Sequence, residues 1–175
     1  MNFDKYTIKS QEVLQKAAEI TTGNGGQAIE PAHFLKAIFL ADENVFPFLL
    51  KKNAINSSAL SEKLDALLNT FPKVSGQQPY LSNDSAKVLQ NAEKELKQFG
   101  DEYIAIEHIL IGLLEGKDKT ALLLKEVGFQ KKELILSIKE LRGGNSVNDP
   151  NAESKYKSLQ RYSIDLNELA KKGKI

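Results

Sequence analysis

The sequence predicts an all-α fold built from two pseudo-twofold-related four-helix repeats, followed by a C-terminal linker and helix. Three observations support this. Apolar residues recur at helical spacing along most of the chain, no stretch alternates with the period of two typical of a half-buried strand, and one set of residues occurs twice. The duplication matters most, because an internal repeat determines how the whole chain divides into structural units.

The duplication is recorded in residues that match 75 positions apart. Val13-Leu14-Gln15 recurs as Val88-Leu89-Gln90, and Ile29, His33 and Leu35 recur as Ile104, His108 and Leu110. Further along, the offset slips to 74, so that Leu49-Leu50-Lys51 matches Leu123-Leu124-Lys125. Both histidines of the chain fall on the same repeat position. The chain therefore contains two copies of one unit, at about residues 5–70 and 80–142.

Start and stop signals divide the first repeat into four helices. Thr7 is a suitable N-cap, because its hydroxyl accepts a hydrogen bond from N–H groups that the first turn leaves unpaired, and Gly23-Asn24-Gly25-Gly26 ends this helix. Pro31 favours the first turn of the second helix, since its missing N–H is no loss there. The third helix is expected over Val45 to Lys52, and the fourth after Asn56-Ser57-Ser58.

The second repeat follows a connector over residues 71–79, where two prolines and a glycine cannot continue a helix. It opens at Ser82, and Gly100 is expected to end its first helix. The remaining helices are expected over Ile106 to Glu115, Thr120 to Val127 and Lys132 to Leu141.

The character of the chain changes after Leu141. Residues 143–152 are polar and contain helix breakers, a composition typical of a flexible linker, so the repeat domain (1–142) is expected to end at residue 142. Residues 153–160 are compatible with a helix, and Ser163 to Lys172 form a better-capped helix with an apolar stripe. We expect residues 153–175 to begin the connection to a further module of a longer protein.

Composition and charge exclude several classes of protein. The chain carries 24 Lys+Arg and 23 Asp+Glu, for a net charge of +1, and lacks the basic stripe that binding to nucleic acid requires. It has no cysteine, which fits a cytoplasmic protein, and no stretch approaches the ~20 apolar residues of a membrane span. We expect a soluble cytoplasmic protein without nucleic-acid or membrane partners.

No motif predicts catalysis or a cofactor site. The segment from Gly112 to Asp118 comes nearest to a phosphate-binding loop, but its glycines are too close together and Asp118 replaces the magnesium-binding hydroxyl. The two histidines lack the further ligands of a metal site, and each is more simply explained as packing its ring while bonding a helical turn. Glu107 and His108 diverge by about 100° on a helix, so they form no dyad. We therefore expect no catalytic residue, metal or cofactor within these residues.

The remaining function class is binding. Two similar half-domains meet at a seam, and such seams are favoured places for apolar grooves. Thr7, Asp101 and Glu107 are candidate polar positions on the rim of this groove. Each also has a structural explanation, as a helix cap, as part of a turn after Gly100, or as a favourable charge at a helix N-terminus.

The repeated second-helix segment resembles a known family. Residues 29–35 (IEPAHFL) and 104–110 (IAIEHIL) are similar to the I-x-x-E-H-[IL]-L pattern in the double-repeat N-terminal domain of Clp unfoldases. Residues 71–76, 141–147 and 159–175 are similar to the connector, and to the stretch leading to the first ATPase module, of ClpB-type disaggregases. The resemblance covers the whole chain.

This resemblance implies a substrate-capturing domain of a hexameric, ATP-driven disaggregase that works with a DnaK-type chaperone system. The domain would bind exposed apolar segments of unfolded or aggregated proteins, and the linker over residues 143–152 would let it swing them to a central pore. ATP and magnesium would bind in modules after residue 175, and the fragment itself would be a monomer. The resemblance associates the positions of Thr7, Asp101 and Glu107 with substrate binding.

Two alternatives concern the ligand. The domain could instead dock adaptors in a Clp protease unfoldase of the ClpA or ClpC type. Relatives that recognise phosphorylated arginine carry a glutamate before the histidine in both repeats, whereas Ala32 precedes His33 here. The missing carboxylate argues against phosphoarginine recognition in the first repeat, since a guanidinium needs one.

Overall fold

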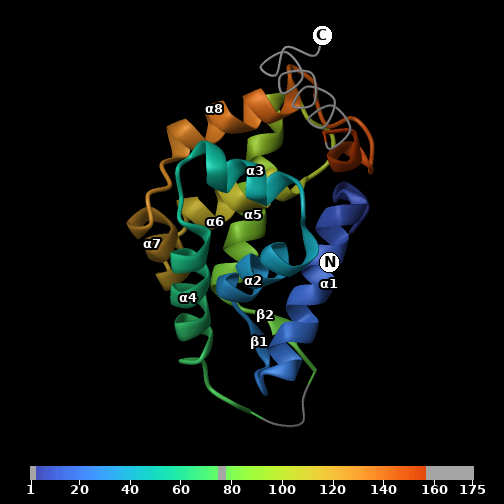
Figure 1. Cartoon of the computed structure of the whole chain (residues 1–175). Coiled ribbons are helices and arrows are strands. Elements are labelled where there is room, and N and C mark those ends of the chain that lie inside the picture. The colour runs from blue at the N-terminus through green and yellow to red at the C-terminus, as the bar shows by residue number, and fades with distance from the viewer. Residues whose placement is uncertain (1–2, 75–77, 157–175) are drawn as a thin grey trace, which may run out of the picture.

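The structure is a computed structural model that describes residues 3–74 and 78–156. These residues contain a short 3-10 helix (Phe3–Lys5), eight α-helices and a two-stranded ladder. The first repeat holds α1 (Ile8–Gly23), α2 (Pro31–Ala41), α3 (Val45–Lys52) and α4 (Ser57–Leu68), and the second holds α5 (Asn83–Phe99), α6 (Ile106–Glu115), α7 (Lys119–Glu126) and α8 (Lys131–Arg142) (Figure 1). The predicted all-α fold with two four-helix repeats is confirmed.

Helix starts preserve the offsets read from the sequence. The first two helices of each repeat begin 75 residues apart, at Ile8 and Asn83 and at Pro31 and Ile106. The last two begin 74 residues apart, because α6, with 10 residues, is one residue shorter than α2, with 11. Sequence patterns therefore placed each helix to within two residues of its start.

Capping side chains fix two of these starts. Thr7 accepts a hydrogen bond from the N–H of Ser10 at 3.1 Å, and the equivalent Ser82 accepts one from the N–H of Ser85 at the same distance. Gly100 ends α5 with φ of 66°, a left-handed conformation that favours glycine. The predicted N-cap at Thr7 and the predicted stop at Gly100 are both confirmed.

Two short parallel contacts join the repeats. Strand β1 (Ala28–Ile29) of the first repeat pairs with β2 (Tyr80–Leu81) of the second, and a single bridge between Tyr6 and Ile104 makes the matching contact on the other side. The sequence predicted no strand. Elements of two residues are too short to produce the alternating pattern from which strands are recognised.

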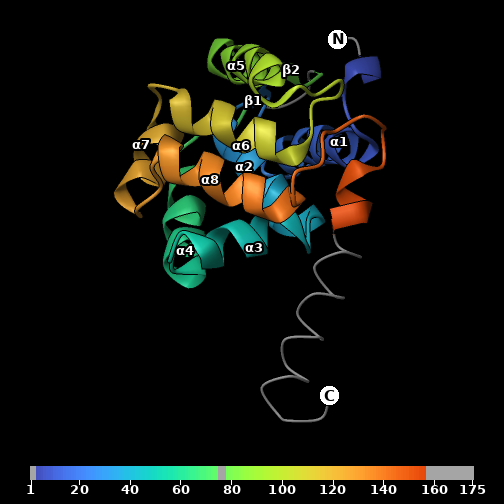
Figure 2. The ribbon, with the colours of Figure 1, turned by 90° about the horizontal axis from the view of Figure 1, so that it is seen from above.

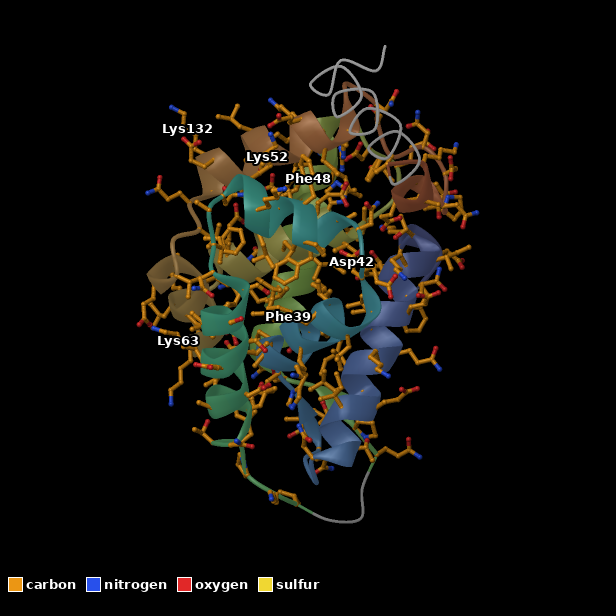
Figure 3. All side chains as sticks on the ribbon, in the orientation of Figure 1. Phe39, Asp42, Phe48, Lys52, Lys63 and Lys132 are labelled. Carbon is orange, nitrogen blue, oxygen red and sulfur yellow. The ribbon has the colours of Figure 1, made fainter. Side chains whose placement is uncertain are left out.

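The repeats pack through a shared core with α6 at its centre. Figure 2 shows α6 lying between α5 and α8, and every residue from Ile106 to Leu114 is buried. Helix α3 lies against α8, and α4 against α7. Ion pairs cross both contacts, from Lys52 to Glu140 at 2.8 Å and from Lys63 to Glu126 at 2.6 Å. Figure 3 shows the two lysines on α3 and α4. Helices of the two repeats therefore pack against each other on more than one side of the shared core.

The segment after α8 differs from its prediction. Residues 143–152 were expected to form a flexible linker outside the domain, yet Val147 and Ala152 are buried in the core cluster, together with Tyr156. Residues 152–156 are helical. The segment lies beside the start of α1, where the N–H of Ile8 donates to the carbonyl of Pro150 at 2.9 Å. The packed domain therefore extends beyond residue 142. Residues 143–152 do not form the free tether that the sequence predicts. The predicted helix over residues 163–172 lies outside the described residues.

Candidate functional site

Arg142 brings two of the predicted site residues together. Its Nε donates to Glu107 Oε2 at 3.0 Å, and its second donor bonds Asp101 Oδ2 at 2.8 Å. Asp101 also contacts His108 Nε2 at 2.7 Å. Helix α8 supplies the arginine, α6 supplies Glu107 and His108, and the turn after α5 supplies Asp101. The four side chains form one buried, charge-assisted network.

Thr7 joins this network from the start of α1. Its hydroxyl donates to Glu153 Oε2 at 2.6 Å, and the same carboxylate oxygen accepts from the N–H of Ile106 at 3.3 Å. The charge of Glu107 acts on Glu153 in turn. The structure therefore gathers Thr7, Asp101 and Glu107 into a single region, which we call the polar cluster together with Arg142, His108 and Glu153.

The side chains of the polar cluster are not at a rim. Thr7, Glu107 and His108 have no exposed surface, and the side chain of Asp101 is fully covered. The expectation of open rim positions is therefore wrong in this structure, because Arg142 and the segment after α8 cover them. Their part in substrate binding stays a prediction.

Burial and charge shift the acidities within the polar cluster. Burial alone would raise the pKa of Asp101, but hydrogen bonds from His108 and the N–H of Val147, with the charge of Arg142, bring it below its ordinary value. Burial, followed by the charge of Glu107, raises the pKa of Glu153 to about 7. Glu153 therefore gains or loses a proton near neutral pH.

Arg142 and Glu153 were not predicted as members of a site. The sequence analysis places Arg142 in a linker motif and Glu153 at the start of a helix. The available signal was Glu107, a carboxylate in the run from Ile106 to Leu114, where His108 is the other polar side chain. A carboxylate buried in such a helix needs a cation, and the chain has few arginines to supply it.

Both histidines close the first turn of a helix. His33 Nδ1 accepts from the N–H of Glu30 at 2.9 Å, and His108 Nδ1 accepts from the N–H of Ala105 at 2.8 Å. The structural explanation of the histidines is confirmed, and the duplication accounts for both. Over residues 3–74 and 78–156, no group of three or more His, Asp or Glu side chains could hold a metal ion.

We predict that His33 makes the domain sensitive to acid. Burial lowers its pKa from 6.5 to about 4, so the folded protein binds this proton less readily than the unfolded chain. Its stabilising contribution is fully present above pH 6.5 and is lost as the pH falls through 4. The difference in unfolding free energy between wild type and His33→Gln, measured in urea, should therefore shrink as the pH falls from 7 to 4. A difference that is constant with pH would contradict the assignment.

An apolar groove lies where the second repeat crosses the first. It measures about 380 Å³, and its lining comes from α1, from the start of α2 and from the two strands. The lining residues are Phe3, Gln11, Leu14, Gln15, Ala18, Ile29, Phe34, Pro79, Tyr80 and Leu81. Phe3 and Tyr80 are large apolar side chains that stay 45% and 55% exposed. We call this the seam groove.

The pseudo-symmetric position on the other side of the molecule has a different character. Positions 18 and 80 of the seam groove correspond, 75 residues away, to Glu93 and Lys5. These two form an exposed ion pair at 2.7 Å. Charged groups thus replace apolar ones, and the groove belongs to one side of the seam.

A larger hollow of about 530 Å³ lies at the turn after α1. Its walls include the glycine-rich turn Gly23–Gly26 and the polar side chains of Glu30, Asn69 and Lys73. Size alone does not favour it, since a site for an apolar ligand needs apolar walls. The seam groove is therefore the better candidate for binding apolar chains.

Comparisons with known proteins agree with this architecture. A family model described as the Clp repeat (R) N-terminal domain matches residues 5–127. The chaperone protein ClpB of Bacteroides thetaiotaomicron is 43% identical over 175 residues, and that of Porphyromonas gingivalis is 40% identical over the same length. Each match covers the whole chain and 20% of the relative, so the chain spans about a fifth of the length of these proteins.

Solved structures support the fold. The crystal structure of the Hsp104 N-terminal domain from Candida albicans superimposes with a TM-score of 0.72 at 23% identity, covering 86% of this chain and 99% of that one. The N-terminal domain of the ClpV1 ATPase from Escherichia coli gives a TM-score of 0.68 at 19% identity, covering 79% of this chain and 86% of that one. No helix within the described residues is long and apolar enough to cross a membrane. The chain belongs to the Clp repeat N-terminal domain family, and its similarity to ClpB chaperones extends over its full length.

Proposed function

We propose that this domain captures exposed apolar segments of unfolded or aggregated polypeptides in the seam groove, as the substrate-binding part of a ClpB-type disaggregase. The observation that carries the proposal is an apolar groove with two exposed aromatic side chains, Phe3 and Tyr80, between the repeats of a ClpB-like domain. Aromatic side chains provide large apolar contact area at low entropic cost, which suits recognition of varied sequences.

The proposal also covers the other modules of the longer protein and their assembly. A groove of about 380 Å³ holds only a short stretch of chain, so each domain would bind weakly. In a hexamer, six such domains would raise the overall affinity through effective concentration. We propose that modules beyond these residues bind ATP and magnesium and pull the substrate into a central pore, in the cytoplasm and together with a DnaK-type chaperone system.

The groove predicts a large effect for one substitution. Ala18→Glu places a carboxylate on the apolar wall, where an apolar ligand would have to cover it. We expect the Kd for a permanently unfolded protein, such as reduced and alkylated α-lactalbumin, to rise at least about tenfold, which corresponds to 1.4 kcal/mol. Isothermal titration of the 175-residue chain measures this, and NMR shift mapping reports where the ligand binds.

The duplication supplies the matched control. Position 93 is the pseudo-symmetric copy of position 18 and already carries a glutamate, so the fold accepts a carboxylate there. Removing the exposed pair with Lys5→Ala and Glu93→Ala should leave the Kd unchanged. Equal weakening by both sets of variants, or shifts that map away from the seam groove, would overturn the proposal.

A further inference from the structure

The segment from Val147 to Tyr156 is bound across the polar cluster by several separate contacts. Its carbonyl groups accept from the N–H of Glu102, at 2.9 Å to Val147, and from the N–H of Ile8, at 2.9 Å to Pro150. The N–H of Val147 donates to Asp101 Oδ1 at 2.8 Å. Figure 1 shows the segment beside the upper end of α1. We call residues 147–156 the strap.

Glu153, within the strap, accepts hydrogen bonds from two donors of the first and second repeats. Glu153 takes the hydroxyl of Thr7 and the N–H of Ile106, and its own carbonyl accepts from Asn44 Nδ2 at 3.2 Å. Three residues later, the ring of Tyr156 is buried, and the positive charge of Arg142 acts on its hydroxyl group. The strap therefore occupies the surface around Thr7 and Glu107 as a ligand would, with an acceptor and, three residues later, a large ring.

The fit of the strap is incomplete. Glu153 Oε1 is buried and has no hydrogen-bond partner in the described part of the chain, while the carboxyl group of Glu107 lies against the hydroxyl of Tyr156. The two carboxyl groups also repel one another when both are ionised. Unpaired buried acceptors cost free energy, so the contact is weaker than its area suggests. A strap held in this way is suited to release.

We propose that residues 147–156 form a releasable strap that occupies the surface around Thr7 and Glu107 in place of a client polypeptide, and that a client reaches this surface only when the strap leaves. The proposal rests on the proposed function and extends it to a second surface. The competing client segment reproduces the strap's chemistry, with a carboxyl or carboxamide group followed three residues later by a large apolar side chain.

The protonation of Glu153 should govern the release. Glu153 faces Glu107 from α6 and Tyr156 from the strap, and Tyr156 in turn faces Arg142 from α8. The adjoining hollow is lined by Lys9 and Glu12 of α1 and by Asp42 and Glu43 of the α2–α3 turn. Its pKa is about 7 in the bound strap and near 4.5 in a free one. The proton therefore stabilises the bound strap below pH 4.5, and this stabilisation is lost as the pH rises through 7.

Amide hydrogen exchange of the 175-residue chain tests the release. The amides of Ile8 and Glu102 are bonded to the strap, whereas those of Thr7 and Ile104 are bonded across the repeats, at 3.0 and 2.7 Å, and serve as internal controls. Between pH 6 and 8 we expect the protection factors of Ile8 and Glu102 to fall about tenfold, while the control amides keep theirs. Glu153→Gln keeps the acceptor without the proton, and should abolish this fall.

Each outcome decides one part of the proposal. If the protection factors of Ile8 and Glu102 also fall in Glu153→Gln, or if those of Thr7 and Ile104 fall equally, the proposed release of the strap is wrong. With reduced and alkylated α-lactalbumin, Ile8 and Glu102 should lose protection in the wild-type chain. Binding that leaves both amides protected overturns the competition while the seam groove stands. No binding, either to wild type or to the strap-weakened variant Tyr156→Ala, overturns the proposed function and the competition together.

Discussion

Replacing Arg142 with alanine is expected to lower the free energy of unfolding by about 3–5 kcal/mol, because it leaves buried carboxylates without their counter-charge. The guanidinium is paired with Glu107 at 3.0 Å and Asp101 at 2.8 Å, and all three side chains are at most 3% exposed. Urea denaturation followed by far-UV circular dichroism measures the loss. Arg142→Lys should recover only part of it, since an ammonium cannot bond both carboxylates with a planar fork.

Lys63→Ala is the control for Arg142→Ala. Lys63 also joins two helices through an ion pair, with Glu126, but the two side chains are 43% and 63% exposed. Water screens such a pair, and its loss should cost about 1 kcal/mol or less. If both variants were destabilised by this small amount, Arg142 would not be the buried counter-charge of the polar cluster.

Gly112→Ala is expected to destabilise the domain by about 3 kcal/mol, at the upper end of the range for overpacked cores. A Cβ at Gly112 would lie 2.4 Å from the carbonyl oxygen of Val88 and 3.2 Å from the nitrogen of Ala92. Both atoms belong to the backbone of α5 and cannot turn away as a side chain would. Helices α5 and α6 would have to separate, which thermal unfolding would report as a lowered Tm.

Gly23→Ala is the control for Gly112→Ala. It adds the same methyl group at the end of α1, where no atom outside the local chain lies within 4 Å of the new Cβ. This variant should be neutral or slightly stabilised, because alanine favours helix over glycine. The first repeat carries Ala37 at the position equivalent to Gly112, so the close approach is specific to the second repeat. Equal Tm values for the two glycine variants would contradict the predicted clash between residue 112 and the backbone of α5.

Local signals explain why so much of the fold was predictable. Helix starts followed from short-range chemistry: the hydroxyls of Thr7 and Ser82 cap their own helices, and Gly100 takes up a positive φ. The duplication then tested each assignment twice, because a feature in one repeat had to recur in the other. Such features need no knowledge of distant parts of the chain.

The strap and its arginine were not predictable by the same reasoning. Val147, Ala152 and Tyr156 are single apolar residues in a polar stretch and form no periodic pattern, so their burial depends on partners far away in sequence. Resemblance pointed to Thr7, Asp101 and Glu107 but not to what covers them. Long-range packing, rather than local propensity, decides whether those three side chains are open or covered.

The paired contacts between the repeats bear on the origin of the domain. The N–H of Thr7 donates to the carbonyl of Ile104, and the N–H of Ser82 donates to the carbonyl of Ile29. Each repeat therefore provides hydrogen-bond acceptors for backbone N–H groups of the other. One half alone would leave these groups without protein partners. An ancestor with a single unit would have met the same need by forming a homodimer with twofold symmetry. Joining two such subunits in one chain would remove the need for both sides to be identical, as the apolar groove on one side and the Lys5–Glu93 ion pair on the other illustrate.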